Sequence, residues 1–148
     1  MNLSNAIKVT RHSNAVAAGA AVVTPASGID MANFEGCVFQ VSFGAIVAGA
    51  ATSIEVHTST DDGVADSFTA LLGSLVTVVD TGDNQIFYVD VYRPLERYLK
   101  CIVNRATQNS TVDGITALQY EPKNMPTTND STTVGGGEIH VSAAEGTA

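Results

Sequence analysis

Hydrophobic and polar residues alternate one by one over much of the middle of the chain. The clearest example is GCVFQVSFG, in which Cys37, Phe39, Val41 and Phe43 are each separated by one residue. Successive side chains of a β-strand point to opposite faces, so this spacing places the four residues on one face. The pattern predicts a half-buried strand.

Five later segments show the same period, namely SIEVHTS, LVTVVD, QIFYVDVY, YLKCIVNR and VDGITALQY. In YLKCIVNR we expect Leu99, Cys101 and Val103 to face the core and Lys100 and Asn104 to face solvent. Turn residues such as Asp61-Asp62-Gly63 separate the segments, and Pro94 ends one of them. VADSFTALLGS is compatible with either a short helix or an irregular strand. Six to seven antiparallel strands with short connections predict an all-β fold, a single β-sandwich or jelly-roll-like domain.

The regions that flank this core have a different character. Residues 1–30 alternate weakly, and we expect an extended arm there that can add one edge strand. Residues 31–121 form the predicted core. Residues 122–148 contain two prolines and three consecutive glycines, which predicts an extended tail with a reach of about 90 Å. Within it EIHVS can add to a neighbouring subunit's sheet through Ile139 and Val141; a disordered end without a role is the alternative.

Composition supports strands and argues against some partners. The 148 residues include 18 Val, 8 Ile and 16 Thr but only 7 Leu, and β-branched side chains favour a pleated surface. A net charge of −8 argues against nucleic acid, whose phosphates reward positive charge. No segment has the apolar length of a membrane helix. Cys37 and Cys101 are predicted to be buried free thiols, as in proteins made in a reducing cytoplasm.

Catalytic and cofactor motifs are absent from the sequence. The three histidines, His12, His57 and His140, stand in no recognised catalytic pattern, and we predict that the protein is not an enzyme and holds no cofactor. Asp61, Asp62 and Asp66 cluster after one strand, so calcium is conceivable, but their spacing matches no known loop and aspartate is common in turns. We therefore expect no metal site.

Basic residues gather in one part of the chain. Arg93, Arg97, Lys100 and Arg105 fall within 13 positions of a chain that has 7 Lys and Arg in total. Tyr and Arg are enriched at protein interfaces. The candidate interface residues are Lys8, Arg11, Tyr92, Arg93, Arg97, Tyr98, Ile139 and Val141. The alternative is that these arginines pair within the molecule, with Asp90 and Glu96.

Several segments together resemble a family of small proteins of tailed bacteriophages and prophages. They are SNAIKVTRHSNAVAAG, IDMANFEGCVFQVSFG, VDVYRPLERYLKCIVNRAT, NMPTTNDSTTV and SAAEGTA, and DVYRPLERY is the most specific of them. The resemblance implies a virion protein with a capsid decoration, or cement, role. The implied partners are the major capsid protein and further copies of this chain, as a homotrimer or homodimer, on the capsid surface. No catalytic residue is implied.

Two other functions remain open. One is a tail, connector or fibre-associated virion protein. The other is a host-surface module that binds glycans, against which stand the absence of Trp and the scarcity of aromatic residues near the loops.

Overall fold

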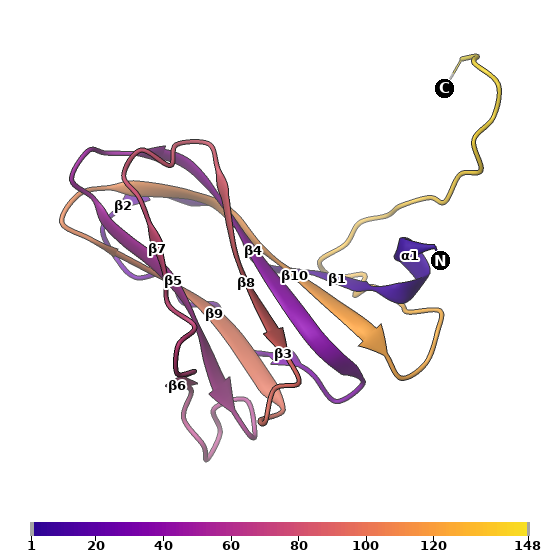
Figure 1. The fold of residues 1–148 in the computed structure, drawn as a ribbon, viewed down its shortest axis with the longest axis horizontal. Helices are drawn as coiled ribbons and strands as arrows, with labels where there is room; N and C mark the ends of the chain where they lie inside the picture. The colour runs from indigo at the N-terminus through magenta and orange to yellow at the C-terminus, as the bar shows by residue number, and fades with distance from the viewer. Residues whose placement is uncertain (1, 148) are drawn as a thin grey trace.

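The alternating segments form strands of two antiparallel sheets that pack face to face (Figure 1). The structure is a computed structural model that describes residues 2–147. Its elements are α1 (Leu3–Ala6), β1 (Lys8–Ser13), β2 (Val16–Gly19), β3 (Ile29–Asp30), β4 (Phe34–Ile46), β5 (Ala51–Ser59), β6 (Thr69–Ala70), β7 (Val76–Val78), β8 (Ile86–Tyr92), β9 (Tyr98–Ala106) and β10 (Ser110–Pro122).

The strand order is that of a jelly roll. The first sheet runs β1-β10-β4-β8, with β2 also on β10, and the second runs β3-β9-β5-β6, with β7 also on β5. If β6 and β7 count as one strand and β2 as a continuation of β1, eight strands remain. In chain order they lie as 1-8-3-6 and 2-7-4-5, so the first strand is beside the last and the connections cross between sheets. This is the double Greek-key sandwich, and the predicted fold class is confirmed.

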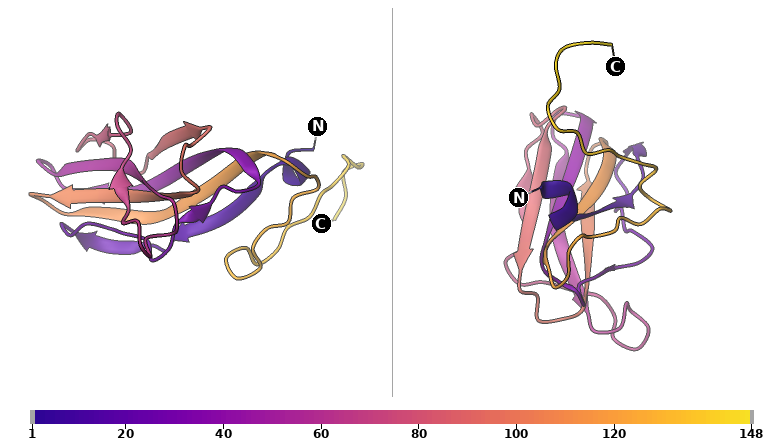
Figure 2. Two further views of the ribbon diagram at one scale, coloured as in Figure 1. Left: turned by 90° about the horizontal axis from the view of Figure 1, so that it is seen from below. Right: turned by 90° about the vertical axis from the view of Figure 1, so that its right-hand side faces the viewer.

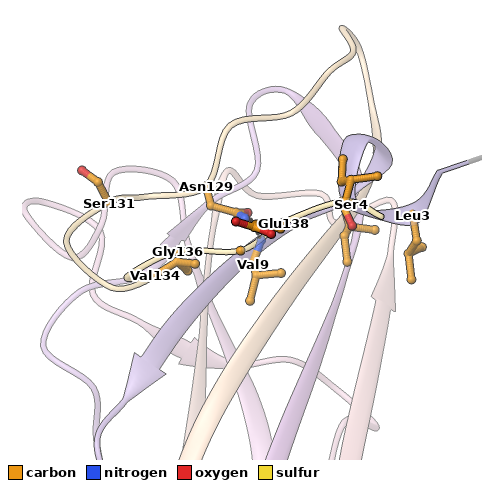
Figure 3. Close-up of a pocket in the computed structure, with 11 residues that line it drawn as sticks. Leu3, Ser4, Val9, Asn129, Ser131, Val134, Gly136 and Glu138 are labelled. Atoms are coloured by element: carbon orange, nitrogen blue, oxygen red, sulfur yellow. Dashed lines mark hydrogen bonds between the residues drawn. The ribbon is translucent and has the colours of Figure 1, made fainter. Parts of the chain in front are cut away.

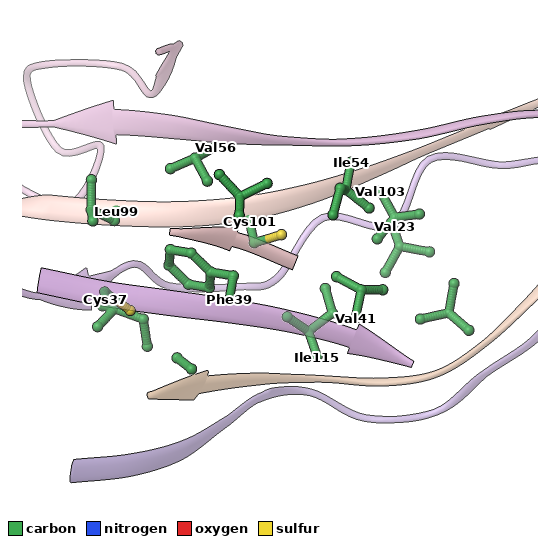
Figure 4. Close-up of a cluster of buried hydrophobic side chains, with 14 of the residues drawn as sticks. Val23, Cys37, Phe39, Val41, Ile54, Val56, Leu99, Cys101, Val103 and Ile115 are labelled. Atoms are coloured by element: carbon green, nitrogen blue, oxygen red, sulfur yellow. The ribbon is translucent and has the colours of Figure 1, made fainter. Parts of the chain in front are cut away.

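The core lies between the two sheets and is built from the residues that the alternation placed inward. Cys37, Phe39 and Val41 on β4 and Leu99 and Val103 on β9 have no exposed surface (Figure 4). Each large apolar side chain buried in this way contributes roughly 1.5–3 kcal/mol. Lys100, which we expected to face solvent, is also largely covered, with 8% of its surface exposed. The outer face of β9 is therefore partly covered by other segments of the chain.

Both cysteines are free and buried in this core, as predicted. Burial raises the pKa of Cys101 to about 12 and that of Cys37 further still. Since only the thiolate reacts readily, neither thiol of the folded protein should react with a disulfide reagent such as DTNB at pH 8. Both should react after unfolding in guanidinium chloride. Reaction of either thiol at its free-cysteine rate in the native protein would contradict this burial.

The edge strand predicted for the N-terminal region is present as β1, but the region is not a free arm, because it pairs with both sheets. β1 pairs with β10 from Lys8 to Ser13, and β2 continues along the same strand. Further on, Val23 bridges to Val103 and β3 pairs with β9. The segment alternates weakly because it occupies the edges of both sheets, where one side of each strand is partly exposed. Its pairing partners all come from β9 and β10, in the last third of the chain.

The C-terminal tail contains no strand or helix between Lys123 and Thr147, and it begins by contacting the N-terminal segment. Thr127 N–H donates to Asn5 O (2.9 Å), and Val9 N–H donates to Asn129 Oδ1 (2.7 Å). The tail then leaves the sandwich near α1 (Figures 1 and 2). Its first part therefore caps the outer edge of β1. The ambiguous segment 64–74 is mostly turns, with the short β6.

Candidate interaction surface

Tyr92 to Tyr98 form the connection between the two sheets at one end of the sandwich, here called the β8–β9 corner. The guanidinium of Arg93 lies 5.1 Å from the centre of the Tyr92 ring, and that of Arg97 lies 5.2 Å from the Tyr98 ring. Cation–π stacking of this kind orders an otherwise flexible arginine. Leu95 at the tip of the corner is fully exposed. The corner thus presents two arginine–tyrosine pairs and an apolar tip.

Both arginines of the corner also pair with carboxylates. Arg97 donates from Nε and Nη2 to the two oxygens of Asp30, at 2.8 and 2.7 Å, while Arg93 Nε lies 3.5 Å from Glu35 Oε2. The hydrogen bond from Arg97 lowers the pKa of Asp30 below its ordinary value. Intramolecular pairing therefore exists, but the partners are Asp30 and Glu35 rather than Asp90 and Glu96. All four side chains stay accessible to solvent.

Lys100 and Arg105 do not join this surface, although the sequence groups them with it. The ammonium of Lys100 lies 4.0 Å from the centre of the Phe68 ring and donates to Ala26 O at 3.4 Å. Arg105 is 5% exposed and donates to the carbonyls of Ala17, Ala21 and Ser110. They are structural residues because the N-terminal segment, which we expected to be free, supplies the carbonyls that accept from both side chains, on opposite faces of β9.

Outward tyrosines extend the corner along the first sheet. The rings of Tyr92 and Tyr120 stack with centres 6.4 Å apart and planes inclined by 5°. Gly36 lies between them in the pairing register, and a Cβ there would overlap the Tyr120 ring. The Tyr120 hydroxyl donates to Asp90 Oδ1 (2.8 Å), and burial together with this bond raises the pKa of Tyr120. Tyr88 is 63% exposed on the same face.

The sequence reasoning did not select Tyr88 and Tyr120. The alternation of the sequence could have indicated them. Buried residues alternate with exposed ones in β8 and β10, and Tyr88, Tyr92 and Tyr120 occupy positions on the outer face. Only the pairing of β8 and β10 on either side of β4 brings the last two side by side.

The eight candidate residues fall in three places. Tyr92, Arg93, Arg97 and Tyr98 share the corner. Lys8 and Arg11 lie on β1, at the opposite edge of the first sheet, and Lys8 helps to lower the pKa of Asp30 and of Asp130. Ile139 and Val141 lie in the tail, 53% and 91% exposed, beyond any strand.

A hollow lies where the tail passes over β1. It is lined mainly by small and apolar residues, among them Leu3, Ile7, Val9, Val134 and Ile139 (Figure 3). Ile139 therefore rests at the rim of a hollow made by its own chain, while Val141 lies beyond it.

The aspartate clusters organise loops. The carboxylate of Asp61 accepts from the backbone N–H groups of Val64, Ala65 and Asp66, at 2.7 to 3.3 Å. Asp80 and Asp83 accept from Gly49 and Ile46 N–H. No group of three His, Cys, Asp or Glu residues is placed to hold a metal within residues 2–147, and no helix there could span a membrane.

Replacing Arg97 tests the ion pair at the corner. Arg97→Met removes the charge and both hydrogen bonds from Asp30, so the pKa of Asp30 should rise toward its ordinary value. Side-chain carboxyl shifts in an NMR pH titration measure it. Arg93→Met, which alters the neighbouring pair with Glu35, should leave the Asp30 titration in place; an unchanged Asp30 pKa in Arg97→Met would contradict the assignment.

Of the comparisons with known proteins, the one with solved structures bears on the fold. No protein-family model and no curated protein sequence matches this chain. Among solved structures, the VP2 subviral particle of infectious bursal disease virus is similar, with a TM-score of 0.52 and 14% sequence identity. The match covers 81% of this chain and 33% of that chain, so this protein spans about a third of its length. The likeness is one of fold: over the matched region both chains are β-sandwiches with jelly-roll-like strand order.

Proposed function

We propose that this chain is a structural protein of a tailed-phage virion, and specifically a decoration protein that stabilises the head by bridging major capsid subunits. The observation that carries the proposal is the jelly-roll order of the strands together with the similarity of fold to a viral particle protein. The segments that resemble tailed-phage proteins support the phage assignment.

The surface gives this role a physical basis. A decoration protein works through many weak contacts repeated over a lattice, so that linked contacts act at high effective concentration. The corner, at the β8 edge of the first sheet, offers exposed Arg and Tyr side chains together with Leu95. The tail, which is fixed at the opposite β1 edge, offers Ile139 and Val141. Two separated contact regions on one chain suit a protein that touches two neighbouring subunits. A homotrimer or homodimer is the simplest closed arrangement.

Copy number and position in purified particles test the proposal. Quantitative gel densitometry should give hundreds of copies per particle, and cryo-electron microscopy should place them in an array on the head surface. A few tens of copies on the tail would replace decoration with a tail, connector or fibre-associated role. Absence from particles would overturn the virion assignment.

Glycan binding is a second candidate, because the structure places more aromatic surface outward than the sequence indicated. Jelly rolls also occur in lectins, and Tyr88 and the Tyr92–Tyr120 stack lie on one exposed sheet face. Binding of host-surface polysaccharide, lost in Tyr88→Ser and Tyr92→Ser and retained in Tyr98→Ser, would favour this function over decoration.

A further inference from the structure

The first sheet has two edges that differ in kind. At the β1 edge, the tail occupies the backbone: Val9 N–H bonds to Asn129, and Ile7 O accepts from the Thr127 hydroxyl. At the other edge, β8 pairs only with β4, and no strand among residues 2–147 pairs with its free side. One edge is capped and the other is open.

The register shows which groups of β8 are unpaired. Arg93 N–H donates to Glu35 O and Phe43 N–H donates to Gln85 O. Backbone groups of an antiparallel strand point alternately to its two sides, so the N–H and C=O groups of Tyr88, Asp90 and Tyr92 point to the free side. No backbone or side-chain group in the described part of the chain bonds to them. Free edges of this kind are the usual template for an added strand.

A groove runs along this free edge. Its far wall is the loop before β7, with Leu71 and Leu72, together with Val76 at the start of β7, and its near wall is β8 from Tyr88 to Tyr92. Leu72 is fully exposed there, and Tyr88 and Tyr92 are more than half exposed. On the inner side, Val89 and Val91 are buried only at the rim of the core, with 8% and 7% exposure. An added strand would meet apolar side chains on both of its faces.

The C-terminal segment GEIHVS, residues 137–142, has the properties of such a strand. Ile139 and Val141 alternate with Glu138 and His140, and the segment is extended without a backbone partner. Its single acidic residue limits repulsion from a protein of charge −8, and Arg93 at the end of β8 offers a complementary charge. The tail of the same copy is fixed at the β1 edge, where Gly137, Glu138 and Ile139 line the hollow over β1, and beyond them it runs away from the sandwich (Figure 1). It therefore leads toward another molecule.

We propose that residues 137–142 of one copy bind as an added strand along the free edge of β8 in a neighbouring copy. Each copy then gives one tail and receives another, and such a head-to-tail contact closes into a ring or, with reciprocal exchange, into a dimer. The pairing can form in the isolated protein, independently of any virus particle.

Light scattering coupled to size-exclusion chromatography, on the full chain over a range of concentrations, tests the pairing. The wild type should form a defined oligomer. Asp90→Pro removes an N–H from the free edge, where proline is tolerated, and Ile139→Asp with Val141→Asp removes the tail anchors. Each variant should associate at least tenfold more weakly. A mixture of the two should form one-to-one heterodimers, because one supplies an intact tail and the other an intact edge.

Matched variants separate pairing from charge and from misfolding. Asp90→Asn keeps the backbone N–H, and Ala143→Asp with Ala144→Asp adds the same charge beyond the segment; both should associate like the wild type. A monomeric wild type, or wild-type association in both disrupting variants, would overturn the proposal.

Cross-linking decides the case even if Asp90→Pro fails to fold. With Tyr88→Cys and Val141→Cys in one chain, mild oxidation should give covalent oligomers, whereas Thr147→Cys in place of Val141→Cys should give few. A link within one chain at monomer mass would show that the tail occupies its own edge, and would overturn pairing between copies.

Discussion

Arg105→Met should lower the free energy of unfolding by about 3 kcal/mol and the Tm by about 10 °C. The guanidinium donates to Ser110 O at 2.7 Å, Ala21 O at 2.7 Å and Ala17 O at 3.0 Å. It therefore ties β9 to the start of β10 and to the segment 17–21. Methionine fills the space but donates nothing, so buried Ser110 O loses its donor and the segment loses two anchors.

Equilibrium urea unfolding followed by circular dichroism measures this loss. Arg93→Met is the matched control, because the Arg93 side chain is 71% exposed and its removal should change stability by less than about 0.5 kcal/mol. Arg105→Lys should fall between the two, since one ammonium cannot span all three carbonyls. Equal stability of Arg105→Met and wild type would show that the three bonds contribute nothing net.

The protein should also lose stability between pH 6.5 and pH 4 through His12. The ring lies 5.3 Å from Phe39 between the sheets, and Cys101 N–H donates to its Nε2 at 3.2 Å. Burial, and then the nearby charge of Lys100, lower the pKa of His12 from 6.5 to about 4. The native state thus keeps the ring neutral, while the unfolded chain takes up a proton near pH 6.5.

As the pH falls, the unfolded state binds the proton before the native state does. The free energy of unfolding therefore keeps its whole His12 contribution above pH 6.5 and decreases as the pH falls toward 4. The loss attributable to His12 amounts to about 3 kcal/mol at most. Urea unfolding at a series of pH values measures it. His12→Gln keeps an acceptor for Cys101 N–H but does not titrate, so its profile should be flatter over this range. His140→Gln, in the exposed tail, should retain the wild-type profile; identical profiles for all three proteins would contradict the prediction.

The sequence predicts the centre of the fold well because alternation is a local signal. The positions of Phe39, Ile54 and Val103 follow from counting by twos, and all three are fully buried. The same counting predicts that Lys100 points away from the core and is exposed to solvent. Its direction on β9 is as predicted, but the side chain is largely covered. The segment around Ala26 that covers Lys100 is distant in sequence, so the local pattern cannot indicate it.

The N-terminal region shows where the local alternation fails to predict the fold. β1 is an edge strand of the first sheet, and its His12 side chain also reaches the second sheet. There His12 Nε2 accepts the hydrogen bond from Cys101 N–H that a neighbouring strand would otherwise accept. Nothing near His12 in the sequence indicates that role. The candidate surface was likewise predicted in part: Tyr92, Arg93, Arg97 and Tyr98 meet at one corner, but their carboxylate partners and Tyr120 come from strands distant in sequence.

The adjacency of β1 and β10 bears on how the chain folds during synthesis. β10 lies between β1 and β4 in the first sheet, so β1 has no partner until residues 110–122 have left the ribosome. Until then β4 presents an open edge and the N-terminal strands remain unpaired, which exposes them to wrong partners. Long-range pairing of this kind also makes folding slow compared with that of helical proteins. A chain that stops before β10 should therefore aggregate rather than form a smaller sandwich.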